Sequence, residues 1–91
     1  MKIVINTDYG GFGLSNEAIH EYCLRKGLNE VSYYDIPRND IDLVEIVESL
    51  GSRANTRVSS LKIVEIPNDV DWQIEEYDGM EWVAEKHRTW R

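Results

Sequence analysis

A β-branched run that stops at three closely spaced glycines is the feature that most constrains the fold of this chain. Residues Lys2 to Thr7 are apolar and β-branched in the middle, which predicts a short buried strand. Gly10, Gly11 and Gly13 follow, and a glycine cluster of this density predicts a loop. Because Ser15 is a good N-cap, the segment predicts a strand, a tight turn and a helix in direct succession.

The predicted helix begins after Ser15 and ends before Gly27. Its apolar residues recur at three- and four-residue spacing and predict one buried stripe, formed by Ala18, Ile19, Tyr22 and Cys23. Leu14 and Ile19 are spaced for a hydrophobic staple across the N-cap. Gly27 follows two basic residues and is placed as the left-handed residue that ends the helix.

The middle of the chain predicts two more strands and a second helix. The expected elements are, in order, a strand at Val31–Ile36 stopped by Pro37, a helix capped by Asn39 or Asp40 and ended by Gly51, a loop with an irregular turn at Ser52–Ser60, and a strand at Leu61–Ile66. The buried face of the second helix is expected to consist of Leu43, Val44, Val47 and Leu50.

A hairpin is predicted at the end of the chain. Asp78-Gly79 separates two alternating segments, Trp72–Tyr77 and Met80–Glu85, and a type I′ turn needs positive φ at both central positions. The predicted order is therefore β-α-β-α-β plus a C-terminal β-hairpin, in one small α/β domain over residues 1–91. Two βα units favour parallel neighbouring strands joined by right-handed crossovers.

Composition excludes several classes of protein. The chain has 10 Lys and Arg against 17 Asp and Glu, and a net charge of −7 argues against direct binding of duplex DNA. Its one cysteine, Cys23, allows no internal disulfide and no thiolate zinc site, and fits a reducing compartment. No apolar run approaches the roughly 18 residues of a membrane span. We therefore expect an acidic protein of the cytoplasm, without a membrane contact.

The glycine loop is the first candidate for a binding site. A glycine-rich turn between a strand and a helix N-terminus can hold an anion, because free backbone N–H groups and the helix dipole point into it. The candidate ligand-binding residues are Tyr9, Gly10, Gly11, Phe12, Gly13 and Ser15, with the two aromatic rings placed to stack on a base or sugar. The spacing matches neither the phosphate-loop nor the dinucleotide motif, so a tight connection without a ligand is the alternative.

The basic C-terminal segment is the second candidate. His87, Arg88 and Trp90 combine charge with a stacking face, which suits a nucleotide-like ligand. Alternatively, His87 and Arg88 pair with the acidic hairpin, and Trp90 covers an edge of the core.

The remaining charged and titratable residues favour ordinary structural roles. The acidic side chains of the hairpin alternate with aromatic ones and could imitate a phosphate backbone, or could keep exposed strand edges from aggregating. His20 lies near Glu17, but a metal site needs three or four converging ligands, and none is expected. Cys23 is expected in the core. No spacing nominates a catalytic residue, and no cofactor is expected.

Several motifs are spread over nearly the whole chain. They are Lys2-Ile-Val-Ile-Asn6, Tyr9-Gly-Gly-Phe-Gly-Leu-Ser15, Glu17-Ala18, Tyr34-Asp-Ile-Pro-Arg38, Leu61-Lys-Ile-Val-Glu-Ile-Pro67, Glu75-Glu-Tyr-Asp-Gly79 and Glu81-Trp-Val-Ala-Glu-Lys-His-Arg-Thr-Trp90. With these motifs the chain resembles a family of small accessory proteins of tailed bacteriophages and prophages. The resemblance implies action in the cytoplasm of the bacterial host, commonly against host defence, and it implies no catalytic residues.

These observations lead to one main hypothesis of function and two alternatives. The main hypothesis is a counter-defence protein that binds and sequesters a small anionic, nucleotide-derived signal without turnover. Ligand pockets measure roughly 300–1,000 Å³, so a domain this small is expected to form a homo-oligomer with sites between subunits. The alternative is an acidic inhibitor of a host defence protein or nucleic-acid-binding protein. A small hydrolase or transferase with His87 or His20 as base is a third hypothesis.

Overall fold

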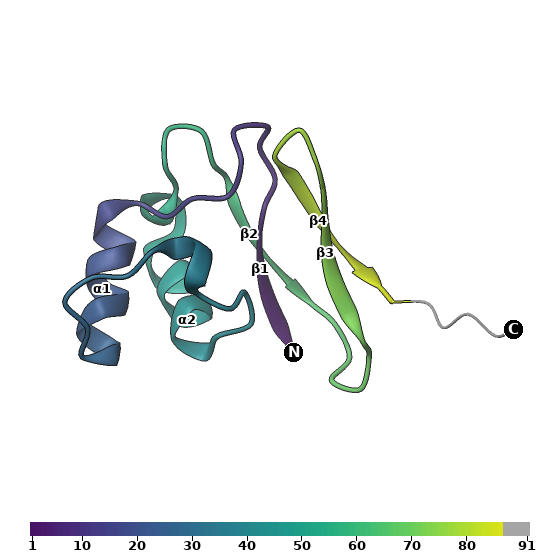
Figure 1. Cartoon of the computed structure of the whole chain (residues 1–91), viewed down its shortest axis with the longest axis horizontal. Helices are drawn as coiled ribbons and strands as arrows, with labels where there is room; N and C mark the ends of the chain where they lie inside the picture. The colour runs from purple at the N-terminus through teal and green to yellow at the C-terminus, as the bar shows by residue number, and fades with distance from the viewer. Residues whose placement is uncertain (87–91) are drawn as a thin grey trace, which may run out of the picture.

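The computed structural model describes residues 1–86 and consists of two helices and four strands in two small antiparallel sheets (Figure 1). The elements are, in order, β1 (Lys2–Asn6), α1 (Asn16–Lys26), the 3₁₀ turn η1 (Tyr33–Asp35), α2 (Ile41–Leu50), the 3₁₀ turn η2 (Gly51–Ala54), β2 (Leu61–Glu65), β3 (Trp72–Tyr77) and β4 (Met80–Glu85). Both helices lie on one side of the β1–β2 sheet, and the β3–β4 hairpin lies on the other (Figure 1). The expected α/β class is confirmed, while the expected order of elements is not.

The segment Val31–Ile36 does not form the predicted strand. Ser32 accepts a hydrogen bond from the Tyr34 N–H and caps the short turn η1, and Ile36 alone in the segment is fully buried. Strand propensity acts through packing against neighbouring strands, and no strand of residues 1–86 lies beside this segment. The chain therefore passes through both helices before it returns to the sheet, and β1 pairs with β2 in antiparallel rather than parallel orientation.

The main core lies between the β1–β2 sheet and the two helices. Val4 of β1 and Leu43 of α2 are completely buried in it. The other members of this core are Phe12, Leu14, Ala18, Tyr22, Ile36, Val44, Ile46, Val47 and Ala54. Ile3 and Ile5 alternate with Val4, so their side chains lie on the opposite face of β1, and they are buried as well. Strand β1 is thus buried on both faces.

The ends of both helices agree with the sequence signals. Ser15 caps α1 through a hydrogen bond from the Ala18 N–H to its Oγ, and Gly27 ends the helix in the left-handed region, with φ of 69°. Asp40 caps α2 by accepting hydrogen bonds from the N–H groups of Asp42 and Leu43 at 2.9 and 3.2 Å. Neither helix of the described residues is long and apolar enough to cross a membrane.

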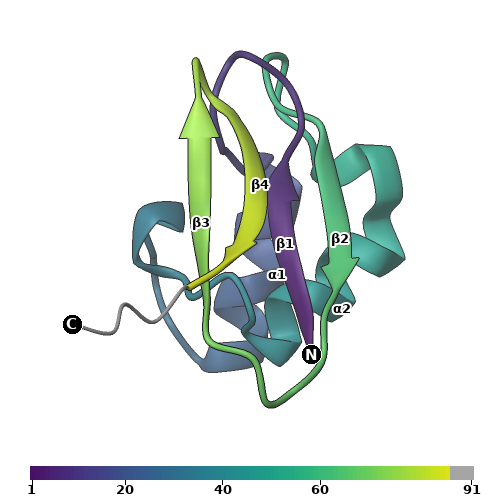
Figure 2. The ribbon, with the colours of Figure 1, turned by 90° about the vertical axis from the view of Figure 1, so that its right-hand side faces the viewer.

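The hairpin forms at the predicted position, with Asp78-Gly79 as its turn. Tyr77 pairs with Met80 across a two-residue turn, in which Asp78 and Gly79 have φ values of 56° and 92°. Strand β4 is the one that lies alongside β1 (Figure 2). The turn of the hairpin consequently reaches the glycine loop, which follows the same end of β1.

Candidate functional site

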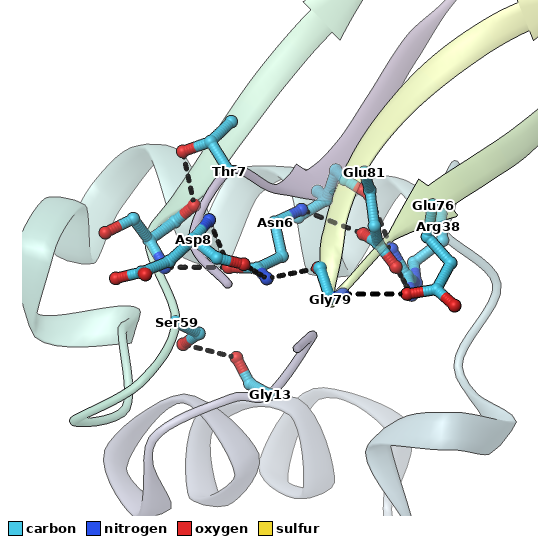
Figure 3. Close-up of polar contacts among 11 residues, drawn as sticks. Asn6, Thr7, Asp8, Gly13, Arg38, Ser59, Glu76, Gly79 and Glu81 are labelled. Carbon is cyan, nitrogen blue, oxygen red and sulfur yellow. Dashed lines mark hydrogen bonds and ion pairs between the residues drawn. The ribbon is translucent and has the colours of Figure 1, made fainter. Parts of the chain in front are cut away.

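Asn6, the last residue of β1, joins three loops at the end of the sheet. Its side chain is completely buried, and its Nδ2 donates to the carbonyl oxygens of Asp8 and Gly79 at 2.6 and 2.8 Å. Its Oδ1 accepts from the N–H groups of Ser60 and Asp8 at 2.8 and 3.3 Å. Every hydrogen-bonding position of this amide is used, so Asn6 fixes the glycine loop, the loop before β2 and the hairpin turn relative to one another (Figure 3).

Arg38 and Glu81 form an ion pair beside Asn6. The two guanidinium nitrogens Nη1 and Nη2 of Arg38 lie 2.7 and 2.8 Å from the two carboxylate oxygens of Glu81 (Figure 3). The guanidinium carbon of Arg38 lies 3.5 Å from the centre of the Phe12 ring. Both charged side chains are largely buried, with 19% and 9% of their surface exposed. A planar guanidinium between an aromatic face and a carboxylate is a geometry that lysine could not reproduce.

A cleft of about 430 Å³ opens next to this ion pair. Four segments that are far apart in the sequence line it: the glycine loop, the segment around η1, the loop before β2 and the hairpin turn. The lining residues are Gly10, Gly11, Phe12, Gly13, Tyr33, Tyr34, Arg38, Thr56, Val58, Glu76, Gly79 and Glu81. The volume lies within the range of small-molecule sites in proteins.

Close backbone packing explains two of the glycines at this cleft. A Cβ atom on Gly10 would overlap the side chain and the carbonyl of Val58, and one on Gly79 would overlap the Tyr9 carbonyl and the Gly11 backbone. Gly79 also has a positive φ that other residues rarely adopt. The glycine loop is therefore held between the loop before β2 and the hairpin turn.

Three aromatic rings continue along one wall of the cleft. The Phe12 ring meets Tyr33 edge-on at 5.9 Å between ring centres, and Tyr33 contacts Tyr34 at 4.5 Å. Phe12 is buried, whereas 77% of the Tyr34 surface is exposed. The series therefore runs from the core to solvent and leaves the Tyr34 ring accessible.

The charges of the cleft are one cation and two carboxylates. Arg38 is paired with Glu81, and Glu76 lies on the hairpin side (Figure 3). One oxygen of Glu76 accepts a hydrogen bond from the Gly79 N–H at 2.9 Å, and no ion pair to Glu76 exists within residues 1–86. The cleft thus offers one unpaired carboxylate and no unpaired cation among its lining residues.

The structure brings together part of the predicted site. Gly10, Gly11, Phe12 and Gly13 line the cleft, and Tyr9 lies next to them with 63% of its surface exposed. Ser15 is outside this cleft: its Oγ donates to the Arg53 carbonyl and accepts from Ala18, so it serves as a helix cap. The predicted residues His87, Arg88 and Trp90 lie outside the described residues.

The predicted site omits the residues on the other walls of the cleft. These are Tyr33, Tyr34, Arg38, Thr56, Val58, Glu76, Gly79 and Glu81. The run Pro37-Arg38 and the acidic hairpin were visible in the sequence, but nothing local joins Arg38 to a carboxylate 43 residues later. The contact depends on the hairpin folding back against β1.

The outer face of the hairpin is a second exposed feature. Trp82 and Tyr77 point away from the core, with 43% and 70% of their surfaces exposed. Glu75 lies opposite Trp82 in the register and accepts a hydrogen bond from the indole Nε1 at 3.1 Å. Within residues 1–86, β3 pairs only with β4 and leaves its outer edge open.

His20 and Cys23, the other described residues considered for chemistry, both lie on α1. His20 is exposed on α1, and its neighbour Glu17 is engaged with Arg53 at 2.6 Å. Cys23 is buried, as predicted, and is a free thiol. Among residues 1–86, no three His, Cys, Asp or Glu side chains are placed to hold a metal ion.

Comparisons of the chain with protein-family models, with curated proteins and with solved structures find no match. The resemblance to phage accessory proteins therefore stays a prediction.

Proposed function

We propose that this chain is a non-catalytic binding protein whose hairpin docks on a basic surface of a partner protein. The observation that carries the proposal is the exposure of Trp82 and Tyr77 on the outer face of the hairpin, beside Glu75. Exposed aromatic side chains are the residues that most often anchor protein interfaces. The surrounding carboxylates and the net charge of −7 favour a basic partner by long-range attraction.

The resemblance to phage accessory proteins supports a bacterial partner. Under that resemblance, the biological role we propose is to block a host defence protein or nucleic-acid-binding protein. A basic groove that normally holds nucleic acid would attract the acidic hairpin.

Sequestration of a small anionic signal stays a prediction with less support. The glycine loop lines a cleft of suitable volume, and this observation favours a ligand. However, the guanidinium of Arg38 is paired with Glu81, and Glu76 would lie beside any phosphate placed in the cleft. The described charges of the cleft therefore favour a protein-directed function over an anionic ligand.

Site-specific photocrosslinking in bacteria tests the proposed function. A benzophenone amino acid replaces Tyr77, and the matched control carries it at Leu24, which is 64% exposed on α1. We expect one crosslinked protein from position 77 and none from position 24. Glu75→Lys should lower its yield at least about tenfold, because like charges would then meet in the interface, while Glu30→Lys should not.

Two results would contradict the proposed function. One is the absence of any crosslinked protein at position 77 above the level of position 24. The other is a crosslink whose yield is the same with Glu75→Lys as without it.

A further inference from the structure

We infer that the cleft at the glycine loop binds an arginine side chain presented by the partner protein. The inference rests on the proposed function and names the chemical group that the partner supplies. It assigns the cleft to a guanidinium cation, in contrast to the anion expected from the glycine loop alone.

The cleft already contains one guanidinium held by the chain itself. Arg38 stacks on Phe12 at 3.5 Å and makes two hydrogen bonds to Glu81. An aromatic face combined with a carboxylate that accepts two N–H groups is the arrangement by which proteins select arginine. The cleft wall thus shows one complete arginine site, occupied from within.

A second pair of such groups lines the same cleft and is open. The Tyr34 ring continues the aromatic series beyond Phe12 and Tyr33 and is 77% exposed. Glu76 uses one oxygen for the Gly79 N–H and has no ion pair within residues 1–86. An aromatic face and a carboxylate therefore remain for a second cation in the same cleft.

Charge and size both favour this occupant. Glu81 neutralises Arg38, so the unpaired charge of the described cleft is the carboxylate of Glu76. A volume of about 430 Å³ accommodates a whole guanidinium and part of its aliphatic stem. Arginine is preferred to lysine, because a planar, weakly hydrated guanidinium loses less on leaving water and stacks on an aromatic ring.

The place of the cleft connects it with the proposed docking surface. Glu76 and Tyr77 are neighbours on β3, with their side chains on opposite faces of the strand. One borders the cleft, and the other belongs to the outer face. A partner that covers the turn end of the hairpin can contact both at once, with arginine as the anchor in the cleft.

An NMR titration of the whole chain tests the inference without the partner. The probe is N-acetyl-arginine methylamide, and its control is N-acetyl-citrulline methylamide, which has nearly the same shape and no charge. We expect saturable shifts of the backbone amides of Gly10, Gly11, Gly13 and Gly79, with a dissociation constant in about the millimolar range. The citrulline compound should cause no saturable shift at these amides.

Two variants make the titration specific. Glu76→Gln should weaken binding of the arginine probe about three- to fivefold, as expected for an exposed charge contact. Glu75→Gln removes the same charge from the outer face of the hairpin and should leave the dissociation constant unchanged. Both variants should retain the amide spectrum of the folded protein, which excludes unfolding as the cause.

Each possible failure has a separate meaning. Equal shifts with both probes, shifts outside the cleft, or equal binding by the Glu76→Gln variant would overturn the arginine site. The photocrosslink at Tyr77 does not require the cleft, so a captured partner together with no arginine binding rejects this inference alone. Arginine binding without any crosslinked protein rejects the proposed function and keeps the site.

Discussion

Arg38 and Glu81, from two different parts of the chain, occupy the edge of β1 that does not pair with β2. The Arg38 carbonyl accepts a hydrogen bond from the Val4 N–H at 2.9 Å, and its Nη1 donates to the Val4 carbonyl at 3.2 Å. Oε1 of Glu81 accepts from the Asn6 N–H at 2.8 Å. Side chains and one carbonyl thus occupy positions that a neighbouring strand would otherwise fill, which protects this edge from pairing with another chain.

Loss of Glu81 should destabilise the fold far more than loss of a surface carboxylate. Glu81→Ala leaves the largely buried Arg38 without its counterion and the Asn6 N–H without its acceptor, so we expect a loss of about 3 kcal/mol in the free energy of unfolding. Glu85→Ala, at an exposed position at the end of the same strand, should change it by less than about 0.5 kcal/mol. Urea unfolding followed by circular dichroism measures both. Equal losses for the two variants would show that the ion pair has no structural importance.

Asn6 should not tolerate aspartate. Asn6→Asp replaces an amide that donates to two carbonyl groups with an oxygen that would face them, at a completely buried position. We expect a loss of about 2–4 kcal/mol at neutral pH. The loss should shrink as the pH falls, because a protonated carboxyl can again donate one hydrogen bond.

The same urea experiment at pH 7 and pH 4 tests the Asn6 prediction. Asn29→Asp, at an exposed position, adds the same charge and serves as its control. A loss that does not depend on pH, or one no larger than that of Asn29→Asp, would contradict the prediction.

Gly10 should tolerate alanine less well than Gly27, for steric reasons. Gly10→Ala places a methyl group against the Val58 backbone, which a side-chain rotation cannot relieve, and we expect a loss of about 3 kcal/mol. Gly27→Ala meets open space and only the cost of its left-handed conformation, about 1–2 kcal/mol. Thermal unfolding of the two variants gives the comparison. A smaller loss for Gly10→Ala would show that the glycine loop moves away from Val58 easily.

Much of the fold follows from signals within a few residues. Ser15 and Gly27 bound α1 as expected, and Asp78-Gly79 form the turn of the hairpin. Each of these signals acts through a local hydrogen bond or a backbone angle, so a few neighbouring residues are enough to predict the end of the helix or the turn. The strand expected at Val31–Ile36 depended on a neighbour that the fold does not supply, and it forms a turn instead.

Little of the candidate site follows from such signals. The glycine loop was visible, and four of its residues do line the cleft. Arg38, Tyr34 and Glu76 reach the cleft only because the hairpin folds against β1 and η1 replaces a strand. These residues set the charge of the cleft, and with it the charge of the ligand expected there. A glycine-rich turn considered without them favours an anion.

The loss of stability at acidic pH should depend in part on Asp40, the cap of α2. Burial by itself would raise the pKa of this carboxyl, but hydrogen bonds from the Leu43 N–H, Lys26 and Tyr22 outweigh it and hold the pKa below its ordinary value. A carboxyl whose pKa is lower in the folded than in the unfolded protein stabilises the fold above its unfolded pKa of about 4. That contribution is lost as the pH falls from there through the lower pKa of the folded state.

Asp40→Asn isolates this effect, because asparagine caps a helix about as well as aspartate but carries no charge. We expect the variant to lose about 1 kcal/mol at pH 7, through the lost contacts with Lys26, and to lose less further stability than the natural chain between pH 5 and pH 2. Asp69→Asn, at an exposed position, should keep the pH dependence of the natural chain. Urea unfolding at several pH values measures the slope of the free energy of unfolding against pH in each protein. Since the folded state binds fewer protons than the unfolded one at Asp40, an unchanged slope in Asp40→Asn would mean that other carboxyl groups cause the loss of stability at acidic pH.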